Sequence, residues 1–209
     1  CTDASAGHYV DTPASTSQFA CTAGTYNPST GSSSAADCLP TDAGNYVPMA
    51  GAAAQIPCAT GSYQPSLGQA SCILADPGHY VPTEQSQTQS ECLLGTFQAY
   101  SGSSSCSDAE PGHYVDSNGS SSQSDCPPTT YNPATGSDDR DDCIDVGPGH
   151  YSDEWGAAEQ LECALGTYQP NSGQMLCIDA DSGHFGGSSG AISQSACPAG
   201  TYNRSEASG

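Results

Sequence analysis

Hydrophobic and polar positions along the chain follow a short repeat rather than a helical period. An aromatic residue recurs every 17 residues, with two steps of 20, and in all but one case a G-x pair precedes it. No stretch keeps a 3.6-residue apolar period over three turns. Short H-Y-V and T-Y segments are bounded by Gly, Pro, Asn and Ser, a pattern that is typical of strands joined by turns. The aromatic residues are Tyr9, Tyr26, Tyr46, Tyr63, Tyr80, Phe97, Tyr114, Tyr131, Tyr151, Tyr168, Phe185 and Tyr202.

Each aromatic residue belongs to a half-module that is expected to form one small, irregular β-hairpin. A cysteine lies alternately eight and five residues before the aromatic, so that long halves read C-x5-G-H-Y-V and short halves read C-x2-G-T-Y. In most short halves Asn-Pro or Gln-Pro follows the aromatic, where proline presets φ for a turn, and a glycine closes the turn. These turn glycines, five residues after the aromatic, are Gly31, Gly68, Gly102, Gly136 and Gly173.

A long and a short half together form a repeat of 34 or 37 residues. The order of lengths recurs after three repeats, which predicts two super-repeats, 1–105 and 106–209. The next cysteine of the series would lie just beyond residue 209, so we expect a longer array, because natural array ends carry atypical capping repeats. The predicted repeats are 1–37, 38–71, 72–105, 106–142, 143–176 and the incomplete 177–209.

Composition changes the expected source of stability. Leu, Ile, Val and Phe together number only 21, so the chain cannot offset its conformational entropy with one large core. Twelve regularly spaced cysteines predict a disulfide framework, which persists in oxidising compartments. We expect a small disulfide-rich, mostly irregular and β fold, an elongated linear array of hairpins from a secreted or cell-surface protein. Aromatic residues stacked on disulfides or on the next module's backbone would form its only core.

The charge excludes several classes of partner. There are 23 acidic residues against two basic ones, for a formal net charge of −21. Nucleic acids and anionic lipid surfaces require clustered Lys and Arg, and no apolar run reaches the roughly 18 residues of a membrane span. We therefore expect this segment to bind no nucleic acid and to insert into no membrane.

The short halves carry a C-x2-G-T-Y…G-x3-C motif, for example from Cys58 through Gly68 to Cys72. This motif resembles the cysteine-rich repeats of ephrin-type receptors and the first-half modules of tumour-necrosis-factor receptors. Long halves match less well, and the C-x2-C pairs frequent in that family are missing. The resemblance implies an elongated ectodomain and carries over no ligand. It also implies the pairs Cys21–Cys38, Cys58–Cys72, Cys92–Cys106, Cys126–Cys143 and Cys163–Cys177, with Cys1 and Cys197 bonded outside the chain.

Without the resemblance, a second disulfide pairing stays open. It links Cys1 to Cys21, Cys38 to Cys58, and so on, and it leaves no cysteine unpaired. Loop closure entropy depends only logarithmically on loop length, and each bridge is worth roughly 3 kcal/mol in either pairing. Energetics therefore do not separate the two.

Candidate chemical groups are few, and we predict no catalytic residue, no cofactor and no enzyme. The histidines of five long halves lie at least 34 residues apart, so we interpret them as residues at the solvent edge: His8, His79, His113, His150 and His184. An acidic run supplies oxygen ligands suited to Ca²⁺ but lacks the D-x-D-x-D-G spacing of a calcium loop, so a solvated charge run is favoured. The calcium candidates are Asp138, Asp139, Asp141 and Asp142.

Polar residues also suggest structural roles and modification. Six glutamines, three residues before the second cysteine of each repeat, are expected to satisfy unpaired backbone groups. Asn118 and Asn203 begin N-glycosylation sequons, and the Ser- and Thr-rich stretches 29–34 and 117–124 are suited to O-linked sugars. The glutamines are Gln18, Gln55, Gln89, Gln123, Gln160 and Gln194.

Together these features predict a structural protein that forms a rod, stalk or filament shaft. Its partners would be copies of itself or neighbouring repeats of a longer chain, and attached glycans. The alternative is a ligand-binding or adhesive ectodomain of a receptor or giant cell-surface protein. A binding site should make one module irregular, and the largest departures from the repeat are Trp155, Thr129 in place of glycine, and Tyr100.

Overall fold

The computed structural model describes residues 1–202, which form eleven two-stranded antiparallel sheets and two 3-10 helices. Every first strand carries the aromatic residue of a half-module, and every strand is two residues long. The predicted disulfide-rich array of hairpins is therefore confirmed. The hairpins are β1–β2 (His8–Tyr9, Phe19–Ala20), β3–β4 (Thr25–Tyr26, Leu39–Pro40), β5–β6 (Asn45–Tyr46, Ile56–Pro57), β7–β8 (Ser62–Tyr63, Ile73–Leu74), β9–β10 (His79–Tyr80, Ser90–Glu91), β11–β12 (Thr96–Phe97, Ser107–Asp108), β13–β14 (His113–Tyr114, Ser124–Asp125), β15–β16 (Thr130–Tyr131, Ile144–Asp145), β17–β18 (His150–Tyr151, Leu161–Glu162), β19–β20 (Thr167–Tyr168, Ile178–Asp179) and β21–β22 (His184–Phe185, Ser195–Ala196).

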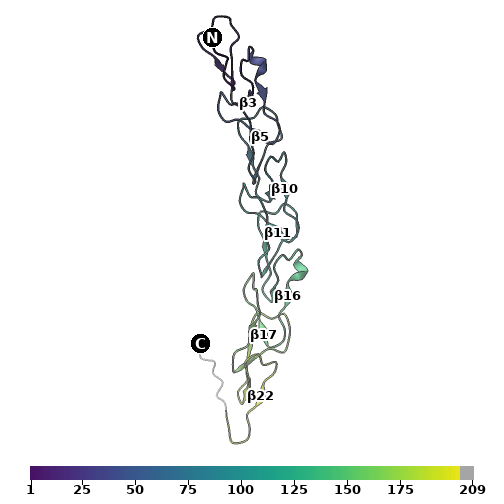
Figure 1. Cartoon of the computed structure of the whole chain (residues 1–209). Coiled ribbons are helices and arrows are strands. Elements are labelled where there is room, and N and C mark those ends of the chain that lie inside the picture. The colour runs from purple at the N-terminus through teal and green to yellow at the C-terminus, as the bar shows by residue number, and fades with distance from the viewer. Residues whose placement is uncertain (203–209) are drawn as a thin grey trace. The chain divides into compact units, whose positions relative to one another are not determined.

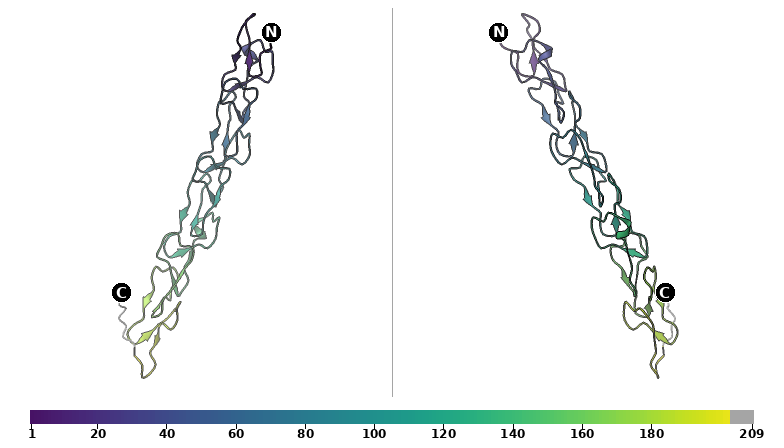
Figure 2. Two further views of the ribbon diagram at one scale, coloured as in Figure 1. Left: turned by 60° about the vertical axis from the view of Figure 1, so that its left-hand side comes forward. Right: turned by 90° about the vertical axis from the view of Figure 1, so that its right-hand side faces the viewer.

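The strands β1 to β10 belong to one unit and β13 to β22 to a second, while residues of β11 and β12 are assigned to both. Within each unit the hairpins follow one another in chain order (Figures 1 and 2). Strands this short cannot be stable as isolated hairpins. Their stability has to come from contacts between half-modules and from the disulfides. Unit 1 comprises Cys1–Cys92, Phe97–Ser107 and Gly119–Ser121, and unit 2 comprises Leu93–Thr96, Asp108–Asn118 and the chain from Ser122 onward.

Three backbone hydrogen bonds join each half-module to the next, and they recur at equivalent positions. In the first pair, Gly7 N–H donates to the Asn27 carbonyl (2.8 Å), Val10 N–H donates to the Ser32 carbonyl (3.0 Å), and Gly31 N–H donates back to the Ala4 carbonyl (2.8 Å). The same set recurs through all ten successive pairs up to the half-module of Phe185. Long and short halves are thus equivalent in backbone register, although their sequences differ. Backbone groups that a thin hairpin leaves unpaired are satisfied by its neighbour.

At eight of the aromatics, the glycine two residues before the ring is required by a contact with the half-module after next. Gly78 has φ +80°, and a Cβ at this position would lie well inside 3.0 Å of the Gly119 carbonyl oxygen. Gly78 belongs to the half-module of Tyr80, and Gly119 to that of Tyr114. Only glycine combines this left-handed backbone with so close an approach. These eight half-modules therefore contact both the next half-module and the one after it.

The fully buried positions are not the aromatic residues, so the prediction of an aromatic core is wrong. The aromatics from Tyr9 to Tyr168 are half-buried, and one ring pair is recorded in residues 1–202, Tyr9 with Phe19 (5.6 Å between centroids). The buried residues lie mainly five before and one after the aromatic, where the chain passes between neighbouring half-modules. No aromatic ring is buried at either position. Five before the aromatic, all at most 7% exposed, are Ala4, Cys21, Thr41, Cys58, Ala75, Cys92, Ala109, Cys126, Val146, Cys163 and Ala180.

Five disulfides join each short-half cysteine to the cysteine that follows it in the sequence. The short-half member is buried in every case, and the Cα–Cα distances are 5.6–5.8 Å, within the usual range. Each bond ties the buried centre of one half-module to the start of the next. Cys1 and Cys197 have no disulfide partner within residues 1–202, and their bonding outside the chain stays a prediction. The bonds are Cys21–Cys38, Cys58–Cys72, Cys92–Cys106, Cys126–Cys143 and Cys163–Cys177.

The two longer steps of the repeat are explained by the 3-10 helices, η1 (Ala35–Asp37) and η2 (Arg140–Asp142). Each is inserted in a short half whose bonded cysteines are 17 residues apart, whereas the other three pairs are 14 apart. Ser34 and Asp139 cap them through capping boxes with Asp37 and Asp142. The extra turn leaves the register between half-modules unchanged.

Candidate functional site

The six glutamines anticipated as structural residues all bind the backbone. The Gln89 side-chain oxygen accepts from Asp76 N–H at 2.8 Å, and its amide donates to the Asp76 carboxylate at 2.7 Å. The other five accept from the equivalent N–H, 13 residues upstream. The structural interpretation of these residues is confirmed, and the glutamines close the loops of the long halves.

The histidines are half-buried at one end of five of the six long-half hairpins and do not converge. The Nδ1 atoms of His8, His79, His113 and His150 lie 3.0–3.2 Å from the carbonyl oxygen two residues upstream. The Nε2 atom of His113 also lies 3.0 Å from Asp125 on the partner strand. His184 occupies the same place in its own hairpin. These contacts orient each ring within its own half-module.

The acidic run proposed for Ca²⁺ surrounds helix η2. Asp139 is its N-cap and accepts from Asp141 N–H at 2.8 Å, while the Asp142 carboxylate accepts from Asp138 N–H at 3.0 Å and from Asp139 N–H at 3.3 Å. Two of the four carboxylates are thus engaged in capping. Within residues 1–202, no group of three or more His, Cys, Asp and Glu side chains has an arrangement that could hold a metal ion.

Asn118, the first residue of a sequon, is exposed at the tip of a long-half turn. Its side-chain oxygen accepts from Leu94 N–H at 3.1 Å, and Gly119 follows with φ +69°. The second sequon residue, Asn203, lies outside the described residues.

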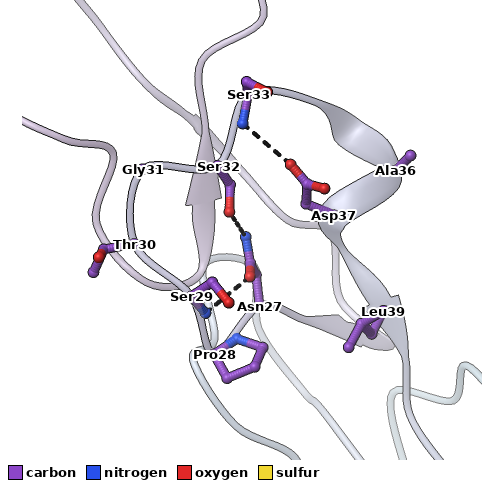
Figure 3. A pocket seen from close by; sticks show the side chains of 10 residues that line it. All are labelled: Asn27, Pro28, Ser29, Thr30, Gly31, Ser32, Ser33, Ala36, Asp37 and Leu39. Carbon is purple, nitrogen blue, oxygen red and sulfur yellow. Dashed lines mark hydrogen bonds between the residues drawn. The ribbon is translucent and has the colours of Figure 1, made fainter.

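Shallow pockets lie beside the turns of two short halves. Figure 3 shows the one at Asn27, whose side-chain amide donates to Ser32 Oγ (2.7 Å) and whose oxygen accepts from Ser29 N–H (3.0 Å). Ser33 N–H donates to Asp37 at 3.1 Å, and Leu39 forms an apolar wall that is 44% exposed. The polar groups bind one another, so the pocket presents no convergent catalytic set.

Three residues that depart from the repeat occupy different places. Trp155 and Tyr100 are 66% and 78% exposed in the turns of their half-modules. Thr129 stands where glycine is otherwise found and keeps the left-handed backbone, with φ +78°. It lines a second pocket together with Met175 and Ile178. A β-branched residue at positive φ is strained, so the irregularity at Thr129 carries an energetic cost.

Thr129→Gly should raise the free energy of unfolding by about 1 kcal/mol, because glycine removes the cost of a left-handed β-branched residue. Urea unfolding of the variant and of the unsubstituted chain measures the difference. Thr130→Gly is the control, since Thr130 is in a strand and its hydroxyl donates to the Pro127 carbonyl at 2.7 Å. That substitution should destabilise the protein. A lower stability of Thr129→Gly would contradict the assignment of strain.

Comparison with known families agrees with the hairpin and disulfide pattern. Residues 149–197 match the family described as "Tyrosine-protein kinase ephrin type A/B receptor-like". The matched segment contains Cys163–Cys177, and its backbone hydrogen bonds recur along the rest of the described chain. No curated protein matches the chain.

The resemblance to ephrin-receptor-like repeats is thus confirmed over residues 149–197. This family is a cysteine-rich repeat of receptor ectodomains and not a family of enzymes. The family match and the five disulfides point to an extracellular cysteine-rich repeat domain. No helix in the described part of the chain is long and apolar enough to cross a bilayer.

Proposed function

We propose that the chain is a structural segment of an extracellular rod, stalk or filament shaft, either secreted or attached to a cell surface. The observation that carries this proposal is the recurrence of one interface through ten successive pairs of half-modules. Every half-module uses the same donors and acceptors toward the next one. Repeats can therefore be added without a new kind of contact, as in other proteins built from stacked repeats.

The partners in this proposal are copies of this chain or neighbouring repeats of a longer chain. The recurring interface supports them, because the same backbone donors and acceptors would serve toward a further half-module. The disulfides of the array would then extend to Cys1 and Cys197.

Charge and modification fit an exposed shaft. A net charge of −21 opposes the lateral bundling of copies at low ionic strength. A glycan on Asn118 would project from a turn, because the residue is exposed and its side-chain oxygen is held by Leu94 N–H. We include N-glycosylation of Asn118 and Asn203 in the proposal.

The proposal is tested by changing the number of repeats. Two copies of residues 1–209 joined in register should form a particle about twice as long as one copy, with the same width, in negative-stain images. The length ratio follows from stacking by one interface. The control is the same fusion after full reduction, which should lose the regular particle. A doubled chain that forms a globule would overturn the shaft proposal.

The irregular residues favour one alternative, a ligand-binding or adhesive ectodomain. Trp155 is exposed, and Thr129 lines a pocket with apolar walls. In the same images, this alternative predicts single particles with a distinct terminal head rather than uniform lengths.

A further inference from the structure

One position recurs at the tip of every half-module turn: the residue four after the aromatic, which immediately precedes the turn glycine or its equivalent. In the half-module of Tyr114 this position is Asn118, the sequon asparagine. Four of the five short halves in the described chain place a hydroxyl side chain there, and Leu67 occupies the fifth. The four tip hydroxyls belong to Thr30, Ser101, Thr135 and Ser172.

The backbone holds these four tips in the same way as it holds Asn118. The next residue is a glycine with a left-handed backbone, at φ +69° after Asn118 and +71° after Thr30. Its N–H donates to the preceding half-module at 2.8 Å in both cases, from Gly119 to Cys92 and from Gly31 to Ala4. The backbone at the tip is therefore held by the hydrogen bond of the following glycine. The side chain of the tip residue takes no part in this bond.

The tip hydroxyls differ from the structural hydroxyls beside them. All four tip residues are exposed, and no hydrogen bond of their side chains is recorded in residues 1–202. Ser32 and Ser137, two positions further on, are at most 9% exposed, and their oxygens accept from Asn27 and Asn132 at 2.7 and 2.8 Å. Figure 3 shows Thr30 directed away from the pair formed by Asn27 and Ser32. Modification at the tip would break no contact that the fold uses.

The surface beside two of the tips suits a sugar. At Thr30, the pocket of Figure 3 has apolar walls formed by Pro28, Ala36 and Leu39. The neighbours of Ser172, Asn171 and Gly173, line the second pocket. Its apolar residues include Met175 and Leu176, which is 67% exposed. A pyranose ring presents an apolar C–H face and a polar hydroxyl edge. It can cover such walls while it remains hydrated, whereas uncovered apolar surface on a shaft favours aggregation.

We propose that Thr30, Ser101, Thr135 and Ser172 are attachment sites for O-linked glycans, placed at the same turn position as the sequon asparagine. This inference rests on the proposed glycosylated extracellular shaft and names its O-linked sites. In each transfer the hydroxyl oxygen forms a bond to the anomeric carbon of a nucleotide sugar. The bond from that carbon to phosphate breaks, the nucleoside diphosphate leaves, and the hydroxyl proton passes to the transferase.

The direct test maps glycopeptides of the full protein isolated from its source, with fragmentation that preserves the sugar bond. The expected result is hexose or N-acetylhexosamine mass on each of the four tip residues and none on Ser32 or Ser137. Unmodified tip residues would overturn the inference, whether or not other serines carry sugar.

A variant series in cells of the source supplies the second readout. The tip variant Thr30→Ala, Ser101→Ala, Thr135→Ala and Ser172→Ala should lose O-linked mass at all four sites after enzymatic removal of N-glycans. The matched control alters four other exposed hydroxyls and should keep that mass: Ser33→Ala, Thr88→Ala, Ser104→Ala and Ser122→Ala. Equal O-linked mass in both variants would contradict the assignment. If the four tip residues carry no sugar and the particle length still doubles on fusion, the glycosylation inference alone is overturned. If the four residues carry sugar and the fusion forms a globule, only the shaft proposal is overturned.

Discussion

Full reduction should unfold the chain under conditions in which the oxidised protein is ordered. The reason is that the described residues bury no aromatic side chain and form no large apolar core, while each bridge contributes about 3 kcal/mol. With five bridges, their removal should exceed the net stability of a typical small domain. Circular dichroism and resistance to proteinase K, with and without reductant, measure the loss. If the structure survives complete reduction, the hydrogen bonds between half-modules are sufficient to keep the chain folded, and the prediction is wrong.

The same effect can be localised to one bridge. Cys92→Ser combined with Cys106→Ser should lower the free energy of unfolding by about 3 kcal/mol. It should also increase amide hydrogen exchange in the half-modules of Phe97 and Tyr114. Cys1→Ser is the matched control, because Cys1 is exposed and has no disulfide partner in the described chain. A double variant as stable as this control would contradict the structural role of the bridge.

Gly78→Ala should be among the most damaging single substitutions outside the cysteines, with a loss of about 3 kcal/mol in the free energy of unfolding. Two effects add: a left-handed backbone is unfavourable for alanine, and the new Cβ overlaps the Gly119 carbonyl. Relief requires the half-modules of Tyr80 and Tyr114 to move apart. That movement would also strain the hydrogen bond from Gly78 N–H to the Gln98 carbonyl (2.7 Å), which lies in the half-module between them. Urea unfolding gives the total loss, and hydrogen exchange of Gly78 and Gly119 should show where it occurs.

Gly147→Ala provides the matched control, since it also replaces a long-half glycine with alanine. A Cβ on Gly147 would lie 3.7 Å from the Gln160 side-chain oxygen, an ordinary contact, and its φ is not left-handed. We expect a change within about 1 kcal/mol, in the stabilising direction, because alanine has less freedom in the unfolded chain. Similar losses for the two variants would show that the close contact at Gly78 is not the cause.

Much of the fold is predictable because each hairpin is a local structure. The turn glycines Gly31 and Gly136 have the left-handed backbone that their positions require, with φ +71° and +70°. The roles of the glutamines also followed from local polar chemistry, since a thin module has few other groups that can satisfy its backbone. Local rules are reliable for these features because each turn, and each bond from a glutamine to the backbone, lies within one half-module.

The prediction of the core failed for a tertiary reason. Aromatic residues are the largest apolar groups in each half-module, so they were expected inside. The structure instead buries residues such as Ala75, Val81 and Cys92, because half-modules approach one another too closely for a ring. Alignment of the half-modules on their aromatics would have shown a signal, since position −5 alternates between cysteine and a small residue.

The sequence by itself determined the repeat, the hairpins, the dependence on cystine and the acidic charge, because these follow from spacing and composition. Only the tertiary structure decided which cysteines are bonded and which backbone groups join successive half-modules. It placed Cys21 beside Cys38, with their Cα atoms 5.6 Å apart, although loop entropy allowed another partner. It also gave long and short halves one hydrogen-bond register, which depends on backbone groups that every residue type carries and that no sequence pattern can reveal.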